Sequence, residues 1–140
     1  MRKGKKERSE AMTRYQKGAR SERELIGILS NAGFSVIRAA GSGVSQTSPP
    51  DILAFKKNIR YAFECKAWDK NRIAISHEKF EALKKWEENT DIITMIAWKI
   101  PYRGWLFARL DELELNAQSY SITRKEIENK NRTLENIVRG

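Results

Sequence analysis

The stretch PDILAFKKNIRYAFECK, residues 50–66, decides the fold of this 140-residue chain. It contains the apolar run DILAF and the start of a second run, RYAFECKAW, and the short segment KKNI separates them. Two apolar runs of this length joined by a short polar turn are typical of a β-hairpin. Both runs are too apolar for an edge strand, so we expect the hairpin to lie at the centre of a sheet.

Three ionisable residues interrupt the apolar pattern of this hairpin. Successive strand residues point to opposite faces of a sheet, so Glu64 and Lys66 share one face and Phe63 points to the other. Glu64 and Lys66 are then about 6.5 to 7 Å apart along the strand, and Asp51 opens the neighbouring strand. A cross-strand salt bridge would account for a Glu-x-Lys triplet alone. Two converging carboxylates repel each other, however, and a divalent cation would relieve that repulsion.

The rest of the chain predicts the elements around the hairpin. Apolar residues recur at helical spacing from about Lys17, and Gly33 supplies a stop. Ser76 is a typical N-cap for a second helix that extends to about Asn89. Further strands are expected at residues 34–40, 92–99 and 104–110, with a short strand at SYSI and weak helices after Thr123 and Thr133. This order predicts an α/β domain with a central mixed five-stranded sheet flanked by helices.

Composition excludes several classes of protein. The chain is 40% hydrophobic, enough for one compact domain. No apolar run approaches the roughly 18 residues of a membrane span, and no signal-peptide stretch is visible, so we expect a soluble cytoplasmic protein without a membrane partner. One cysteine and one histidine exclude an intrachain disulfide and a single-chain Cys/His zinc site. Carboxylates remain as metal ligands, and they favour a hard ion such as Mg²⁺.

Positive charge is concentrated at the N-terminus. The formal net charge is +9, and residues 1–20 contain eight Lys and Arg against two Glu. Residues 1–16 show little apolar periodicity, so we expect a flexible basic arm before a single domain at residues 17–140. The arm is either a solubilising tail or a segment that binds the phosphates of nucleic acid.

Glu22 is a third candidate carboxylate. It precedes Leu25 and Leu29 by three and seven residues, so it lies at the border of the apolar stripe of the first helix. The alternative is an ordinary glutamate that the helix dipole favours near the N-terminus. Glu24 fits that alternative better because it lies off the stripe, which makes Glu22 the functional candidate.

Several separated motifs carry a resemblance to a known family. The PD of Asp51 and the ECK of residues 64–66 resemble the PD-(D/E)xK motif of restriction-endonuclease-like nucleases. The segment KGARSERELIGILSNAGFSVIRAAGSG, then PDI, ECK, ISHEKFEAL and WKIPYRGWLFARL occur in an order that resembles archaeal-type Holliday junction resolvases. The resemblance covers residues 17–110, whereas the N-terminal extension is long and the C-terminal tail matches loosely. It implies a restriction-endonuclease-like fold and a functional set that falls on Glu22, Ser42, Asp51, Glu64 and Lys66.

The resemblance also implies an activity. A homodimer would cut four-way (Holliday) junction DNA with Mg²⁺, for which Mn²⁺ would substitute, and without a small-molecule cofactor. Asp51, Glu64 and the Cys65 main-chain carbonyl would hold the metal, with Glu22 as a further ligand. Lys66 would orient the attacking water or offset charge at the phosphate, and hydrolysis would leave a 5′-phosphate and a 3′-hydroxyl.

Four basic residues are expected to contact the DNA. Arg23 and Arg38 adjoin the motifs and resemble the family's substrate-contacting arginines. Lys17 and Arg20 continue the basic run into the first helix. Contacts of this kind position a protein on phosphates without reading sequence, so the shape of the junction would be what is recognised.

Three other functions stay open at this point. A related nuclease of the same fold could act on duplex, flap or damaged DNA, and a DNA-binding module could have lost its catalytic activity. The intact set of five functional residues argues against such a loss. A basic interaction protein that binds no nucleic acid is the third alternative.

Overall fold

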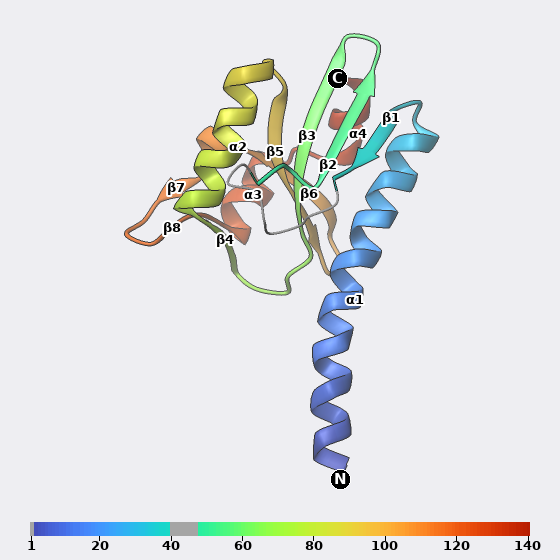
Figure 1. The fold of residues 1–140 in the computed structure, drawn as a ribbon, viewed down its shortest axis with the longest axis vertical. Coiled ribbons are helices and arrows are strands. Elements are labelled where there is room, and N and C mark those ends of the chain that lie inside the picture. The colour runs from blue at the N-terminus through green and yellow to red at the C-terminus, as the bar shows by residue number, and fades with distance from the viewer. Residues whose placement is uncertain (1, 40–47) are drawn as a thin grey trace.

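The computed structural model describes the backbone of residues 2–39 and 48–140 and the side chains of residues 16–39 and 48–140. A central sheet has the strand order β1-β2-β3-β5-β6 (Figure 1). Its strands are β1 (Ser35–Arg38), β2 (Ile52–Lys56), β3 (Ile59–Lys66), β5 (Ile93–Ile100) and β6 (Gly104–Arg109). β3 and β5 are parallel, and the other neighbouring pairs are antiparallel. The predicted mixed five-stranded sheet is therefore confirmed.

The β2–β3 hairpin lies at the centre of this sheet. Ile52 pairs with Phe63, and Lys56 pairs with Ile59. The turn between the two strands places Lys57 in the left-handed conformation, with φ of 53°. β3 is buried on both of its faces from Tyr61 to Glu64, which explains why the apolar pattern of this segment has no clean alternation.

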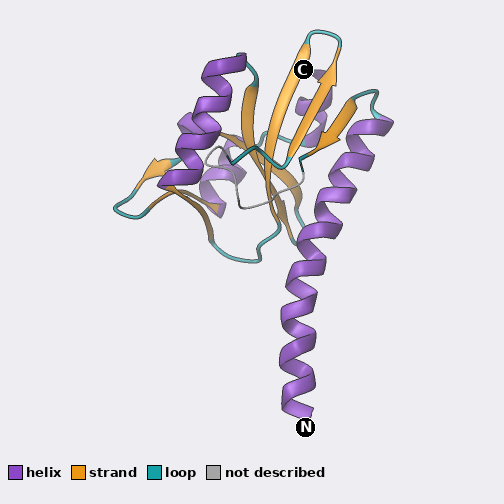
Figure 2. Ribbon diagram, viewed as in Figure 1, coloured by secondary structure: helices purple, strands orange, loops and turns teal. Residues whose placement is uncertain are grey.

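Helices cover both faces of the sheet (Figures 1 and 2). On one face, Leu25 and Leu29 of α1 (Arg2–Asn31) form a core with Phe63 and with α4 (Leu134–Arg139). On the other face, Leu83 of α2 (His77–Thr90) forms a second core with Trp98 and with α3 (Arg124–Lys130). The first core includes Tyr61 and Phe63 of β3, and the second core covers the neighbouring strands β5 and β6 on the opposite face.

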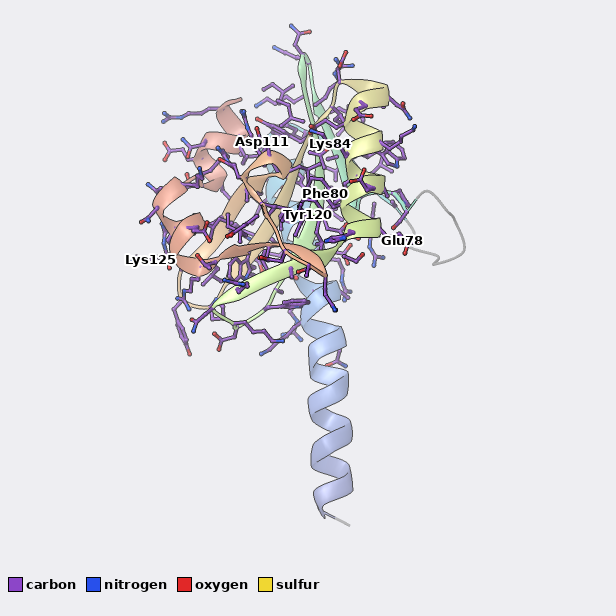
Figure 3. All side chains as sticks on the ribbon, turned by 90° about the vertical axis from the view of Figure 1, so that its left-hand side faces the viewer. Glu78, Phe80, Lys84, Asp111, Tyr120 and Lys125 are labelled. Atoms are coloured by element: carbon purple, nitrogen blue, oxygen red, sulfur yellow. The ribbon has the colours of Figure 1, made fainter. Side chains whose placement is uncertain are left out.

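A second sheet has three strands in the order β4-β8-β7, and the sequence did not predict it. β4 (Arg72–Ser76) and β7 (Glu114–Leu115) each pair antiparallel with β8 (Ser119–Thr123), and the short 3-10 helix η1 (Leu110–Glu112) follows β6. The rings of Phe80 and Tyr120 are stacked with centroids 3.6 Å apart and join α2 to this sheet (Figure 3). β4 is short and its partner lies far along the chain, so no local signal reveals the pairing.

Two of the predicted helix ends are confirmed. Gly33 follows α1 with φ of 94°, and the Phe34 N–H donates to the Leu29 carbonyl at 3.0 Å. This left-handed glycine closes the helix as expected. At the start of α2, the Ser76 hydroxyl accepts a hydrogen bond from the Lys79 N–H at 3.1 Å. Local residue chemistry is sufficient to set these ends.

The start of α1 differs from the prediction. The helix begins at Arg2, not near Lys17, and its N-terminal half projects away from the rest of the chain (Figure 1). Residues 2–16 are rich in Lys, Arg and Glu, which favour a helix by propensity without any apolar stripe. That the basic arm is flexible stays a prediction. Although α1 has 30 residues, no helix in the described part of the chain has an apolar stretch that could span a membrane.

Candidate active site

The β2–β3 hairpin brings Asp51 and Glu64 together at one end of the central sheet. Because Ile52 pairs with Phe63, the residue before Ile52 lies beside the residue after Phe63. The Asp51 Oδ2 atom accepts a hydrogen bond from the Cys65 main-chain N–H at 2.9 Å. This bond fixes the Asp51 carboxylate against β3, so the two carboxylates converge as predicted.

Glu64 is a buried carboxylate whose hydrogen-bonding capacity is not filled. The residue is 7% exposed, and no described group donates a hydrogen bond to its Oε1 atom. Burial and the nearby Asp51 carboxylate raise the pKa of Glu64 to about 7. Lys79 and Lys66 oppose this rise, but less strongly. A buried carboxylate next to a second carboxylate is a strained arrangement that a cation would stabilise.

Lys66 does not form the cross-strand salt bridge that was the alternative interpretation of the motif. Among the described side chains, no carboxylate oxygen lies within 4.0 Å of its Nζ atom. Its ammonium lies instead 5.0 Å from the centroid of the Trp68 ring. Glu64 is also buried, not solvated. The Lys66 ammonium thus lowers the pKa of Glu64 without pairing with a described carboxylate, which leaves it available to a ligand.

Glu22 lies near the site but forms an ion pair of its own. Its Oε1 atom is 3.5 Å from Nε of Arg38 on β1. Burial and the Asp51 carboxylate raise the pKa of Glu22, and Arg38 partly offsets this effect. Helix α1 thus presents Glu22 toward the same end of the sheet as Asp51, on the side that carries Arg38. Its role as a metal ligand stays a prediction.

The other expected DNA contacts lie along α1. Lys17 and Arg20 line a cavity of about 320 Å³ together with Ala67, Asp69 and Lys99. Arg23 is exposed, and its Nε atom donates to the Ala19 carbonyl at 3.3 Å. Ser42 lies outside the described residues.

Sequence reasoning missed two residues of this region. Lys79 on α2 has its Nζ atom 3.5 Å from Glu64 Oε1, and it donates to the Ser48 hydroxyl at 2.6 Å and the Pro49 carbonyl at 2.8 Å. It thereby joins Glu64 to the segment that leads into Asp51. Glu24 forms an ion pair with Lys99 of β5. Both contacts depend on how a helix packs on the sheet, and no local sequence signal indicates them.

The donor set fits a hard divalent cation. Within residues 16–39 and 48–140, no three His, Cys, Asp or Glu side chains lie close enough to form a metal-binding group by themselves. Asp51 and Glu64 nevertheless supply carboxylate oxygens, and Glu64 Oε1 has no hydrogen-bond donor. Carboxylate, main-chain carbonyl and water oxygens are the ligands of Mg²⁺ and similar ions. The residues present therefore suit a divalent ion held by two carboxylates and a main-chain carbonyl.

Comparisons with known proteins identify the family of this chain. The family described as archaeal Holliday junction resolvase (Hjc) matches residues 13–140, so the match extends beyond the residues 17–110 on which the resemblance was based. The crossover junction endodeoxyribonuclease Hjc of Archaeoglobus fulgidus is 34% identical over 106 residues, 76% of this chain and 78% of that protein. The crossover junction endodeoxyribonuclease Hje of Saccharolobus solfataricus is 35% identical over 96 residues, 68% of this chain and 67% of that protein.

A solved structure supports the same assignment. The Holliday junction resolvase Hjc of Archaeoglobus fulgidus superposes with a TM-score of 0.74 at 30% identity, over 80% of this chain and 93% of that one. The predicted restriction-endonuclease-like fold is confirmed by this match together with the mixed sheet. The chain therefore belongs to the archaeal Holliday junction resolvase family.

Proposed function

We propose that this chain is an endonuclease that cuts four-way DNA junctions, with Asp51, Glu64 and Lys66 as its central site. The observation that carries the proposal is the buried Glu64 carboxylate, which faces Asp51 and has an oxygen without a hydrogen-bond donor. The Lys79 ammonium at 3.5 Å offsets part of the charge of this oxygen, but its hydrogen-bonding capacity stays open for a ligand. Membership of the resolvase family supports junction DNA as the substrate.

Asp51, Glu64 and the Cys65 carbonyl would hold the divalent ion, which we propose to be Mg²⁺. Mn²⁺ prefers similar oxygen ligands and would substitute. When bound, such an ion supplies positive charge at the phosphate and makes water a stronger acid. The Cys65 N–H bond keeps Asp51 in position for this role. Glu22 would be a further metal ligand at the edge of the site.

Lys66 would act directly on the substrate. Because no described carboxylate neutralises its ammonium, the group can donate hydrogen bonds to the attacking water or to a phosphate oxygen. Either contact stabilises the charge that develops as water attacks phosphorus in line with the leaving group. The products would be a 5′-phosphate and a 3′-hydroxyl.

Lys79 would hold the carboxylates of Asp51 and Glu64 in position relative to each other. Its ammonium contacts Glu64 on one side and the segment before Asp51 on the other. It therefore acts as a positioning residue, while Lys66 remains available for the phosphate.

Resolution of a junction requires cuts in two opposing strands. We infer a twofold homodimer, because such a dimer presents two identical sites related by symmetry. Light scattering after size-exclusion chromatography should give a mass near twice 16.2 kDa. A mass of one chain, in the presence and absence of junction DNA, would contradict the dimer.

The substrate is tested by a comparison of two DNA molecules. Nicking rates should be measured in Mg²⁺ on a labelled four-way junction and on a linear duplex of matched sequence. We expect cuts in opposing strands of the junction and little cutting of the duplex. Asp51→Asn should abolish cutting, whereas Asp91→Asn should not, because Asp91 caps α2 and asparagine also tolerates its left-handed conformation.

The same experiment separates the alternatives. Equal cutting of junction and duplex would point to a nuclease with a different DNA substrate. Junction binding by the wild-type chain without any cutting would point to an inactive binding module. Absence of both binding and cutting would favour the third alternative, a basic interaction protein that binds no nucleic acid.

A further inference from the structure

The side chains of Glu64, Lys66, Trp68 and Lys70 form a row that extends beyond the end of β3. β3 ends at Lys66, and the ammonium groups of Lys66 and Lys70 both lie against the Trp68 ring. Ala67 and Asp69 alternate with them and line the cavity next to α1. The row therefore presents in order a carboxylate, an ammonium, an indole and a second ammonium.

The ring of Trp68 contacts both of these ammonium groups. The Nζ atoms of Lys66 and Lys70 each lie 5.0 Å from the centroid of its ring. The residue is 39% exposed, although tryptophan is usually well buried. An exposed indole with two lysines and no carboxylate paired to either of them, within the described residues, is a cationic aromatic surface directly beside the site.

The backbone of Trp68 is fixed to the core, although its ring is exposed. Its carbonyl accepts a hydrogen bond at 2.9 Å from the indole nitrogen of Trp98. Trp98 is completely buried and belongs to the core on the α2 face of the sheet. Trp68 is thus held at a set place relative to Lys66, as a side chain that binds a ligand must be.

We propose that Trp68 and Lys70 form a subsite for the nucleotide next to the phosphate that is cut. The indole would stack on the base, and Lys70 would pair with the adjacent phosphate. This inference rests on the proposed nuclease function and names the part of the substrate that the same site holds. Aromatic rings beside basic groups are the usual means of holding single-stranded nucleotides.

The chemistry of a branch point suits this subsite. Exposed cation–π contacts are weak, so each ammonium can leave the ring for a phosphate when DNA arrives. Stacking on the indole needs a base with a free face. Bases can be unstacked at a branch point, whereas bases inside a continuous duplex are covered by their neighbours. The subsite would therefore contribute to selectivity for junctions as well as to affinity.

The test uses the full-length protein and a junction with 2-aminopurine next to the cut site. Ca²⁺ replaces Mg²⁺ so that binding is measured without cutting. Stacking on Trp68 should quench the fluorescence in the wild type and in Trp68→Phe, but not in Trp68→Leu. The affinity of Trp68→Leu for the junction should fall about tenfold, while its affinity for duplex should change little. Unchanged circular dichroism and melting temperature would show that the variant folds.

Lys70 is tested through the salt dependence of binding. Lys70→Gln should reduce the slope of log affinity against log salt by about 1, the effect of one lost phosphate contact. Lys85→Gln is the matched control, because Lys85 is an exposed lysine on α2. We expect its slope to equal that of the wild type.

Two other outcomes would contradict the proposed subsite. Unchanged affinity and quenching in Trp68→Leu would do so, even if the nicking rate fell, because Trp68 would then only orient Lys66. Equal slopes for Lys70→Gln and Lys85→Gln would contradict the proposed phosphate contact of Lys70. These results differ from a failure of the proposed function, in which the wild-type chain would neither bind nor cut the junction.

Discussion

Glu64 should make the stability of the metal-free protein depend on pH. Its pKa is about 7 in the folded chain and 4.5 in the unfolded chain. Between these values the folded state binds more protons than the unfolded state, so the free energy of unfolding falls as pH rises. The loss is complete above the folded pKa and amounts to about 3 kcal/mol.

This prediction is checked by urea unfolding in EDTA from pH 4 to 8.5. Glu64→Gln should remove the decline between pH 4.5 and 7, because glutamine does not titrate. Glu81→Gln, which changes an exposed residue of α2, should keep the wild-type profile. The explanation fails if both variants show the same decline.

Lys79 should stabilise the folded protein through Glu64. Lys79→Met leaves the Glu64 carboxylate buried without its partner, so we expect a loss of about 3 kcal/mol at pH 8. The loss should be smaller at pH 6, where Glu64 is mostly protonated. Lys84→Met is the control, because Lys84 forms only a partly exposed ion pair with Glu87. Equal losses for the two variants at pH 8 would exclude the proposed role of Lys79.

Sequence and structure agree at Asp51, Glu64 and Lys66 for a local reason. Strand alternation and a short turn are properties of neighbouring residues, and together they place two carboxylates at one end of a hairpin. Lys79 reaches Glu64 only through the packing of α2 on the sheet, so its role could not be predicted. The same holds for the ion pair of Glu24 with Lys99.

At the scale of elements, hydrogen bonds of Arg132 connect the C-terminal segment to β6 and η1. Its guanidinium donates to Glu112 of η1 at 2.6 and 3.1 Å and to the Phe107 carbonyl at 3.2 Å. The Phe107 N–H donates in turn to the Arg132 carbonyl at 3.0 Å. Burial would raise the pKa of Glu112, but these bonds and the Arg109 N–H outweigh it and lower the pKa to about 2.

Arg132→Lys should therefore destabilise the protein. Lysine cannot form the paired bonds to a carboxylate, so we expect a loss of about 1 to 2 kcal/mol at pH 7. The difference from the wild type should shrink as pH falls from 4.5 toward 2, because Glu112 becomes protonated. Urea unfolding measures both effects.

The control for this prediction is Arg139→Lys. Arg139 pairs with Glu135 at 2.6 Å, but both side chains are largely exposed. Pairs of this kind contribute little to stability. A larger loss for Arg139→Lys than for Arg132→Lys would mean that the C-terminal segment is not held by the Arg132 contacts.

The pairing of β4 with β8 shows why elements are harder to predict than motifs. The run RIAIS does alternate, but it ends at the Ser76 cap of α2, and helix signals dominate that region. The basic arm shows the converse problem. Its helix depends on residue propensity, and a search for apolar periodicity does not detect it.

At the scale of the whole molecule, the basic arm should contribute to DNA binding. Residues 1–16 contain six Lys and Arg, and each phosphate contact that is lost lowers the salt slope by about 0.9. Replacement of this arm with a neutral Gly/Ser segment of equal length should weaken junction binding and flatten its salt dependence. Unchanged affinity and slope would identify the arm as a solubilising tail.

The account depends most on Glu64 as part of a metal-dependent site that cuts junctions. The most direct measurement is a nicking assay on a labelled four-way junction in Mg²⁺, with wild type, Glu64→Ala and the surface control Glu81→Ala. We predict symmetric cuts by the wild type and the control, and none by Glu64→Ala. Cutting by Glu64→Ala at the wild-type rate would contradict the account.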